Sequence, residues 1–252
     1  SDFRRGEGLA KMPQRPASAQ RGAPRPRLPG MRIGLLTREW PPEAYGGAGV
    51  HVEYLARELR KLIDVDVQCW GAPRDDANAH QVPETLAGAN ASLQTMGISL
   101  AMVAASEGVE LLHSHTWSAN FAGHAGGLYL DVPHVISAHS LEPKRPWKAE
   151  QLGGGYRLSS WIEKTAYEGA DKIIAVSHGM RGDVLDSYPN VDPGKVEVVH
   201  NGIDTELYQP DPNTDLIESV GIDPSRPYVL FVGRITRQKG IAHLPKAAAL
   251  MD

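Results

Sequence analysis

The chain has 252 residues, of which 41% are hydrophobic and 22% are charged, a composition typical of a soluble globular protein. Its formal net charge of -4 gives no reason to expect nucleic acid or an anionic membrane as a partner. No stretch approaches the roughly 18–20 apolar residues that a membrane-spanning helix requires. The single cysteine, Cys69, cannot form an internal disulfide, which fits a cytoplasmic location.

Residues 1–30 are expected to form a disordered extension ahead of a fold that begins at Met31. The segment has seven Arg or Lys residues, two acidic residues, five prolines and four glycines. It buries too little apolar area to offset the entropy lost on ordering, and it lacks the apolar region of a secretory signal. A transit peptide is the less favoured alternative, because the segment shows no amphipathic pattern.

From residue 32 onward, short apolar runs alternate with amphipathic stretches, which predicts alternating strands and helices. Strands are predicted at residues 32–36, 65–69, 111–114, 134–138, 172–176 and 196–199. Helices are predicted at residues 50–62, 101–105 and 121–130 and after the glycine loop at residues 153–155. Such alternation requires crossover connections, so residues 31–200 should form an α/β domain with a doubly wound, mostly parallel, Rossmann-like sheet. Ligands of such sheets bind at the carboxyl ends of the strands.

The last fifty residues have a different pattern. Residues 201–227 are rich in Asp, Pro and Asn and are expected to form a linker. Residues 228–232 predict a new buried strand, followed by a helix that begins near Gly240. We interpret residues 228–252 as the first strand–helix unit of a second domain, truncated before that domain closes a core.

A glycine-rich loop follows the first predicted strand. Gly46, Gly47 and Gly49 come just before the helix that is expected near Val50. Glycine lets backbone amides approach an anion closely, and a helix N-terminus adds a favourable dipole. The loop is a candidate cradle for a pyrophosphate, although it matches neither the dinucleotide fingerprint nor a P-loop. The alternative is a flexible, tightly packed turn.

Histidines mark the ends of two predicted strands. His113 and His115 point to the same face of one strand, but no third ligand has matching spacing, so we expect no metal site. One of the two is expected to pack and the other to face a cleft. His139 directly follows the next strand. It suits a hydrogen bond to a ligand hydroxyl, with a purely structural role as the alternative.

Two cations flank a short loop in the last segment. Arg234 follows the strand predicted at residues 228–232, and Lys239 precedes the helix expected near Gly240. Two cations beside a helix N-terminus suit a diphosphate. A solvated basic turn is the alternative.

The order of these signals, together with several longer motifs, resembles the actinobacterial glycogen synthase and maltose-1-phosphate synthase family of retaining GT-B glycosyltransferases. The motifs are TREWPP (residues 37–42), YGGAGVH (45–51), SLEP (140–143), RPWKAEQLGGGY (145–156), VSHGM (176–180), NGID (201–204) and GRITRQKG (233–240). The resemblance runs from Met31 to the end of the chain. It implies two Rossmann-like domains that face each other across a cleft, with the donor nucleotide on the second and the acceptor on the first.

The resemblance also implies roles for residues already singled out. Arg234 and Lys239 would hold the diphosphate of ADP-glucose, and Gly46 and Gly47 would approach it from the opposite wall. His139 would contact the transferring glucose. These cations neutralise the leaving group, so neither a metal nor another cofactor is expected. The family carries a pair of glutamates on a later helix that this chain does not reach, so we expect the 252-residue chain alone to be inactive.

Two acceptors follow from the resemblance: the end of an α-1,4-glucan such as glycogen, or glucose 1-phosphate, which would give maltose 1-phosphate. Four cations near the expected acceptor wall suit a phosphate: Lys144, Arg145, Lys148 and Arg157. Trp117 and Trp147 suit a neutral glucan, and His115 is a further candidate contact to the acceptor. The alternative for the cations is a solvated face, or pairing with Glu142 and Glu150.

Three other readings stay open. The chain can belong to another GT-B transferase, such as one in a sucrose, trehalose or mycothiol pathway, or to a GT-B epimerase that uses a nucleotide sugar. It can also be a non-catalytic binding fragment. The sequence leaves a homodimer open.

Overall fold

The computed structural model describes residues 30–44, 46–235 and 239–251. Apart from Gly30, the predicted extension at residues 1–30 lies outside them. Contacts divide the chain into a first unit that ends at Asn201 and a second that begins at Gly202. Within the described residues, no helix has the length and apolar character needed to cross a membrane.

The first unit contains one sheet of seven strands in the order β3-β2-β1-β4-β5-β6-β7. The strands are β1 (Arg32–Leu36), β2 (Asp64–Trp70), β3 (Asn78–His80), β4 (Leu111–His115), β5 (His134–Ala138), β6 (Lys172–Ala175) and β7 (Val196–Val198). All six pairings are parallel. The expected parallel, Rossmann-like α/β sheet is confirmed. Its order reverses beside β1, and ligands of doubly wound sheets bind at such a switch point.

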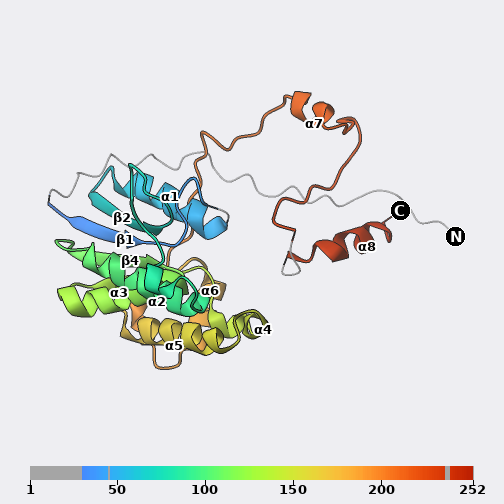
Figure 1. Ribbon diagram of the computed structural model, residues 1–252. Helices are drawn as coiled ribbons and strands as arrows, with labels where there is room; N and C mark the ends of the chain where they lie inside the picture. Colours follow the sequence, from blue (N-terminus) through green and yellow to red (C-terminus); the bar gives the residue numbers. More distant parts are fainter. Residues whose placement is uncertain (1–29, 45, 236–238, 252) are drawn as a thin grey trace. The chain divides into compact units, whose positions relative to one another are not determined.

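Helices cover both faces of this sheet (Figure 1). The main helices are α1 (Gly47–Leu59), α2 (Ala91–Ala104), α3 (Trp117–Leu130), α5 (Gly154–Gly169) and α6 (His178–Ser187), with a short α4 (Lys148–Leu152). Helices α2, α3 and α5 pack against one another in a single layer. The crossover through α1 runs in the opposite direction along the sheet from the crossover through α3. Right-handed crossovers therefore place these two helices on opposite faces.

Two neighbouring residues of β1 show how both faces are filled. Leu35 packs in a core cluster with Val52 of α1, whereas Leu36 packs in another cluster with Met102 of α2. Successive side chains of a strand point to opposite faces. The uninterrupted apolar run of β1 is therefore the pattern of a strand that is buried on both sides.

Helix α2 begins ten residues earlier than predicted. Its first turns bury polar side chains whose hydroxyl groups donate hydrogen bonds to the backbone of the same helix. Thr95 Oγ1 donates to the carbonyl of Ala91 at 2.8 Å, and Ser99 Oγ donates to the carbonyl of Thr95 at 2.9 Å. Asn90 caps the start by accepting from the backbone N–H of Ser92. Because these buried positions are polar, a search for apolar periodicity passes over them.

The second unit corrects one prediction. Residues 228–232 form no strand, and four of their five apolar side chains are exposed, with Val232 at 84%. The backbone N–H and C=O groups of a strand need a neighbouring strand as hydrogen-bond partner. The described residues of this unit contain no strand that could pair with residues 228–232. The expected buried strand is therefore wrong here. The short helix α7 (Asp215–Ser219) lies in the predicted linker, and η5 (Ile241–His243) and α8 (Leu244–Ala248) follow Gly240.

Candidate functional site

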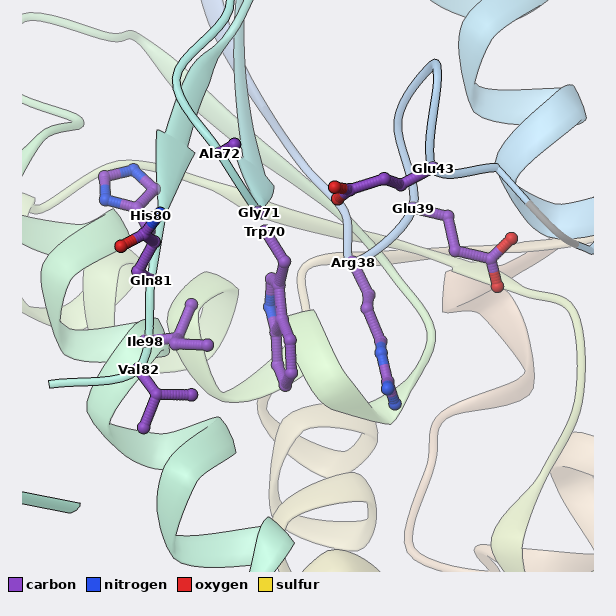
Figure 2. Close-up of a pocket in the computed structure, with 10 residues that line it drawn as sticks. All are labelled: Arg38, Glu39, Glu43, Trp70, Gly71, Ala72, His80, Gln81, Val82 and Ile98. Atoms are coloured by element: carbon purple, nitrogen blue, oxygen red, sulfur yellow. The ribbon is translucent and has the colours of Figure 1, made fainter. Parts of the chain in front are cut away.

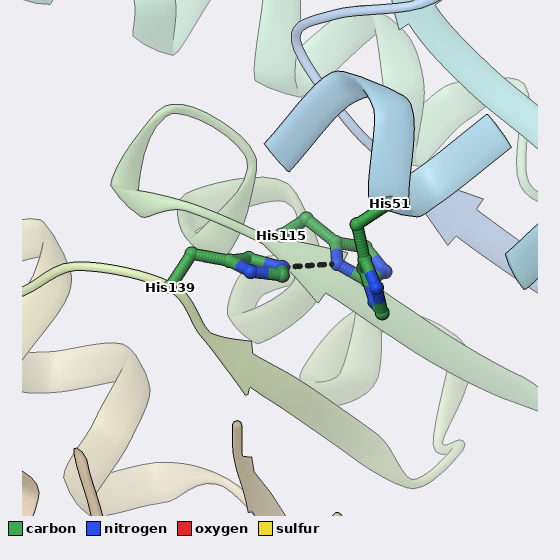
Figure 3. Close-up of side chains that lie close together, drawn as sticks. All are labelled: His51, His115 and His139. Carbon is green, nitrogen blue, oxygen red and sulfur yellow. Dashed lines mark hydrogen bonds between the residues drawn. The ribbon is translucent and has the colours of Figure 1, made fainter. Parts of the chain in front are cut away.

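Three histidines from three elements meet at the carboxyl edge of the sheet (Figure 3). His51 lies on α1, His115 ends β4, and His139 directly follows β5. One ring nitrogen of each lies within 4.8 Å of those of the other two. The closest contact is a hydrogen bond of 3.0 Å between His115 Nδ1 and His139 Nε2. We call these three residues the histidine cluster.

The register of β4 and β5 explains half of this arrangement. His115 lies opposite Ser137 in the sheet. His139 is two residues after Ser137, so its side chain points to the same face of the sheet as that of Ser137. His139 therefore comes beside His115. His113, two residues earlier on β4, bonds Ser137 Oγ through Nε2 at 2.9 Å. Both histidines of the His-x-His pair are buried, so neither opens to a cleft in this structure: His113 bonds within the sheet, and His115 contacts His139.

Burial keeps these imidazoles neutral. It is the largest cause that lowers the pKa of His139 to about 4, and the neighbouring His51 lowers it further. The pKa of His115 falls well below its ordinary value for the same reason, and burial also lowers that of His51. At neutral pH each ring therefore offers one N–H donor and one lone pair. Among the described atoms, His115 Nε2 is buried and has no hydrogen-bond partner.

The glycine loop leads into α1, with Gly46 at its N-cap. The backbone N–H of Gly46 donates to the Glu39 carboxylate at 2.8 Å. A Cβ on Gly49 would lie 2.8 Å from the Glu39 Cβ, whereas a Cβ on Gly47 would meet nothing within 4 Å. Gly49 is thus required by packing, and Gly47 is the glycine of this loop that opens outward. A diphosphate at the Gly46 amide would have to displace Glu39.

The four candidate acceptor cations have different environments. Lys148 is paired with the buried Glu142 at 2.6 Å, and Lys144 pairs with Asp183 on the surface at 2.9 Å. Arg157 is exposed. Arg145 is half-buried. Its guanidinium is only partly satisfied by hydrogen bonds.

Arg145 lies in the loop that follows His139. Its Nη1 donates to Ser140 Oγ at 3.3 Å, while its Nε is buried and has no partner among the described atoms. A buried guanidinium N–H without a partner costs free energy. Of the four cations, Arg145 is therefore the one whose surroundings favour an added anionic ligand.

A buried carboxylate network fixes this loop. Glu142 Oε2 accepts from Ser159 Oγ at 3.0 Å, and its backbone N–H donates to Glu163 Oε1 at 2.6 Å. Tyr188 also donates to Glu163. Burial raises the pKa of Glu163 to about 7. Both carboxylates make their contacts inside the protein. Lys148 therefore pairs with Glu142, which is the alternative to phosphate binding that the sequence left open for this lysine.

The aromatic candidates differ in exposure. Trp117 begins α3 directly after Thr116, whose φ of 66° is strained for a β-branched residue. The Lys148 ammonium lies 5.9 Å from the centroid of the Trp117 ring. Trp147 is 45% exposed and remains accessible to a sugar ring.

A hollow of about 410 Å³ opens beside the ends of β1 and β2 (Figure 2). Its lining includes Arg38, Glu39, Glu43, Trp70, His80 and Ile98. The Arg38 guanidinium lies 4.8 Å from the centroid of the Trp70 ring, a cation–π distance. The sequence reasoning missed this hollow. The sequence could have indicated it, because Arg38 and Trp70 lie at the carboxyl ends of strands that are adjacent in the sheet.

Arg234 and Lys239 both belong to the second unit, where each is exposed. Residues 236–238 between them lie outside the described residues. The structure therefore gives no geometry that relates these cations to the histidine cluster, and their role toward a diphosphate stays a prediction.

Residues 45–207 match the model of the family described as Glycosyltransferase Family 4. The chain belongs to glycosyltransferase family 4. This family-4 chain is 58% identical over 221 residues to an alpha-maltose-1-phosphate synthase of Mycolicibacterium smegmatis, covering 86% of this chain and 57% of the relative. The synthase of the same name from Mycobacterium tuberculosis strain H37Rv is 52% identical over 221 residues, with the same two coverages. The resemblance inferred from the motifs is confirmed.

The family-4 chain spans less than two thirds of the length of these relatives. Among solved structures, it is similar to sucrose-phosphate synthase from Thermosynechococcus elongatus, with a TM-score of 0.69 and 21% sequence identity. The match covers 88% of this chain and 60% of that one. At this identity the likeness concerns the fold alone.

Proposed function

We propose that this chain is the acceptor-side part of a retaining glucosyltransferase that moves glucose from ADP-glucose to glucose 1-phosphate, giving maltose 1-phosphate. The relatives at 58% and 52% identity carry the name alpha-maltose-1-phosphate synthase. Because they are longer than this chain, the activity belongs to the completed protein. By this proposal it acts in the cytoplasm in α-glucan synthesis, and a homodimer stays open.

The observation that carries the choice of acceptor is the environment of Arg145. Its guanidinium combines a buried, unpartnered Nε with one bond to Ser140. Arginine binds phosphate through two parallel N–H groups, which a neutral glucan cannot accept as strongly. Lys148 and Lys144 already have carboxylate partners, so they are poorer candidates for the phosphate of the acceptor.

The donor glucose is expected beside the histidine cluster. His139 is neutral because its pKa is about 4, so it can both donate to and accept from a sugar hydroxyl. Negative charge develops on the ADP leaving group as the glycosidic bond breaks, and fixed cations stabilise it best. We assign this role to Arg234 and Lys239, without a metal or another cofactor.

The acceptor oxygen attacks the same face of the donor sugar that ADP leaves, through an oxocarbenium-like state, so the configuration is retained. A pair of catalytic carboxylates of the glycosidase kind is not part of this proposal. Glu142 and Glu163 are buried in the network that holds the acceptor loop.

The test uses the protein completed with its second domain, assayed with ADP-glucose and either glucose 1-phosphate or glycogen. Arg145→Gln should raise KM for glucose 1-phosphate about 10- to 100-fold, since hydrogen bonds to charged groups contribute about 1.5–3 kcal/mol. Transfer to glycogen should be spared. Lys144→Gln, which breaks only the surface pair with Asp183, is the matched control.

Glycogen is the second candidate acceptor, favoured by the exposed ring of Trp147. An aromatic face on the acceptor wall suits a neutral sugar. If glycogen is the natural acceptor, Trp147→Ala should raise KM for glycogen while Arg145→Gln leaves both acceptors unchanged. That pattern would replace glucose 1-phosphate in the proposal.

A further inference from the structure

The histidine cluster has the chemistry of a transition-metal site. His51, His115 and His139 come from three different elements, and their nearest ring nitrogens lie within 4.8 Å of one another. Three imidazoles with one open position are a known ligand set for Zn²⁺. The sequence offered only the His-x-His pair, because the third ligand comes from α1, more than sixty residues earlier.

We propose that His51, His115 and His139 bind one divalent transition-metal ion of the Zn²⁺ class, with a water molecule in the fourth position. Zn–N bonds of about 2.0–2.1 Å require ligand nitrogens roughly 3.4 Å apart. His115 and His139 already have nitrogens 3.0 Å apart. His51 is only half-buried on α1, so a side-chain rotation can bring it in without moving the sheet.

The protonation state supports binding. A metal binds the lone pair of a neutral imidazole, and each neutral ring carries one such lone pair. The hydrogen bond between His115 and His139 places one proton between the two rings. Whichever ring donates in this bond, moving its proton to the other nitrogen of the same ring, which for His115 is the unpartnered Nε2, frees both bonded nitrogens as ligand atoms. Metal binding therefore requires a change of tautomer and not the loss of a proton.

The ligand set predicts selectivity. Imidazole nitrogens suit Zn²⁺, Ni²⁺, Cu²⁺ and Co²⁺, whereas Mg²⁺ prefers oxygen ligands. The consequence for activity rests on the proposed function: an ion held by His139 occupies the place of the transferring glucose. Zn²⁺ should then inhibit the completed enzyme competitively toward ADP-glucose, and the reaction itself needs no metal.

Binding is tested first on the 252-residue chain, without any activity assay. Calorimetric titration with Zn²⁺ should give one site, and Co²⁺ should give the visible absorption of a tetrahedral complex. His51→Gln and His139→Gln should each weaken Zn²⁺ binding at least about 10-fold, the low end of the losses seen for changes around metal sites. Mg²⁺ should give no binding heat.

The matched control is His178→Gln, an exposed histidine at the start of α6, which should leave Zn²⁺ affinity unchanged. Circular dichroism checks that each variant is folded. If one is not, ring ¹⁵N spectra of the wild-type chain replace it: Zn²⁺ should shift the resonances of His51, His115 and His139 but not that of His178. Unchanged affinity in the cluster variants, equal loss in the control, or unshifted cluster resonances would overturn the proposal. If Zn²⁺ binds at the cluster but does not inhibit, the proposed place of the glucose is wrong and the metal site stands.

Discussion

The backbone N–H of Glu142 donates to the carboxylate of Glu163 at 2.6 Å. This bond ties the loop that follows β5 to helix α5, and both carboxylates are buried. Lys148 supplies one positive charge to the pair through Glu142. A single lysine for two buried carboxylates favours one of them being protonated, and the raised pKa of Glu163 identifies which one.

The first prediction concerns pH. The folded pKa of Glu163 is about 7, above its unfolded value, so its proton binds more tightly to the folded state. This contribution to stability is fully present below about pH 4.5 and is lost as the pH rises through 7. Relative to wild type, Glu163→Gln should therefore gain stability as the pH rises from 5 to 8, by at most about 1.4 kcal/mol per pH unit.

Urea unfolding of both proteins across this range checks the prediction. Gln keeps an oxygen that can accept from the Glu142 N–H and from Tyr188. Glu168→Gln, on the same helix but more exposed, serves as the control and should follow the wild-type pH dependence. Parallel curves for wild type and Glu163→Gln would show that Glu163 is ionised throughout.

The second prediction separates structural from ligand-binding cations. Lys148→Met leaves Glu142 buried without its charge partner, so it should lower the free energy of unfolding by about 3–5 kcal/mol. Arg157→Met, on the exposed side of α5, should change it by less than about 0.5 kcal/mol. Chemical unfolding at pH 7 measures both, and equal effects would contradict the assignment of Lys148 to the loop network.

The third prediction uses two glycines of one loop. Gly49→Ala places a Cβ 2.8 Å from that of Glu39, so overpacking should destabilise the fold by about 1–3 kcal/mol. Gly47→Ala meets no atom within 4 Å and should leave stability within about 0.5 kcal/mol of wild type. In the completed enzyme, Gly47→Ala should instead raise KM for ADP-glucose if the outward-facing glycine approaches the diphosphate. A stable Gly49→Ala would refute the packing role.

The fourth prediction tests the donor cations in the completed protein. Arg234→Ala and Lys239→Ala should each lower kcat by about 10²–10³, because each removes a charge that stabilises the leaving group. Both residues are exposed, so melting temperatures should stay close to wild type. Steady-state kinetics with saturating ADP-glucose provides the measurement, and wild-type kcat in either variant would reject the role.

The sequence predicted the sheet well because its strands are buried on both faces. Six of the seven strands follow from apolar runs such as residues 134–138, which match β5. The third strand, β3, was not predicted because it is only three residues long and two of them, Asn78 and His80, are polar. At residues 228–232 an apolar run of the same kind led to the wrong prediction of a strand, because an apolar run forms a strand only where a partner strand is present.

The site was predicted less completely, because it depends on contacts between distant segments. His115 and His139 were found from their places at strand ends, and the register of β4 and β5 brings them together. His51 was missed as their partner, since its distance to them is set by how α1 packs on the sheet. The pairing of Lys148 with Glu142 was weighed only as an alternative, because no spacing rule ranks one cation above another.

The most direct test of the central claim is the product formed by the completed protein from ADP-glucose labelled in the glucose. The protein is offered glucose 1-phosphate and glycogen together, and the products are separated by mass spectrometry. The account predicts that most of the label appears in maltose 1-phosphate, with retention at the new bond, and that Arg145→Gln shifts it toward glycogen. Label confined to glycogen, or released as free glucose with neither acceptor extended, would contradict it.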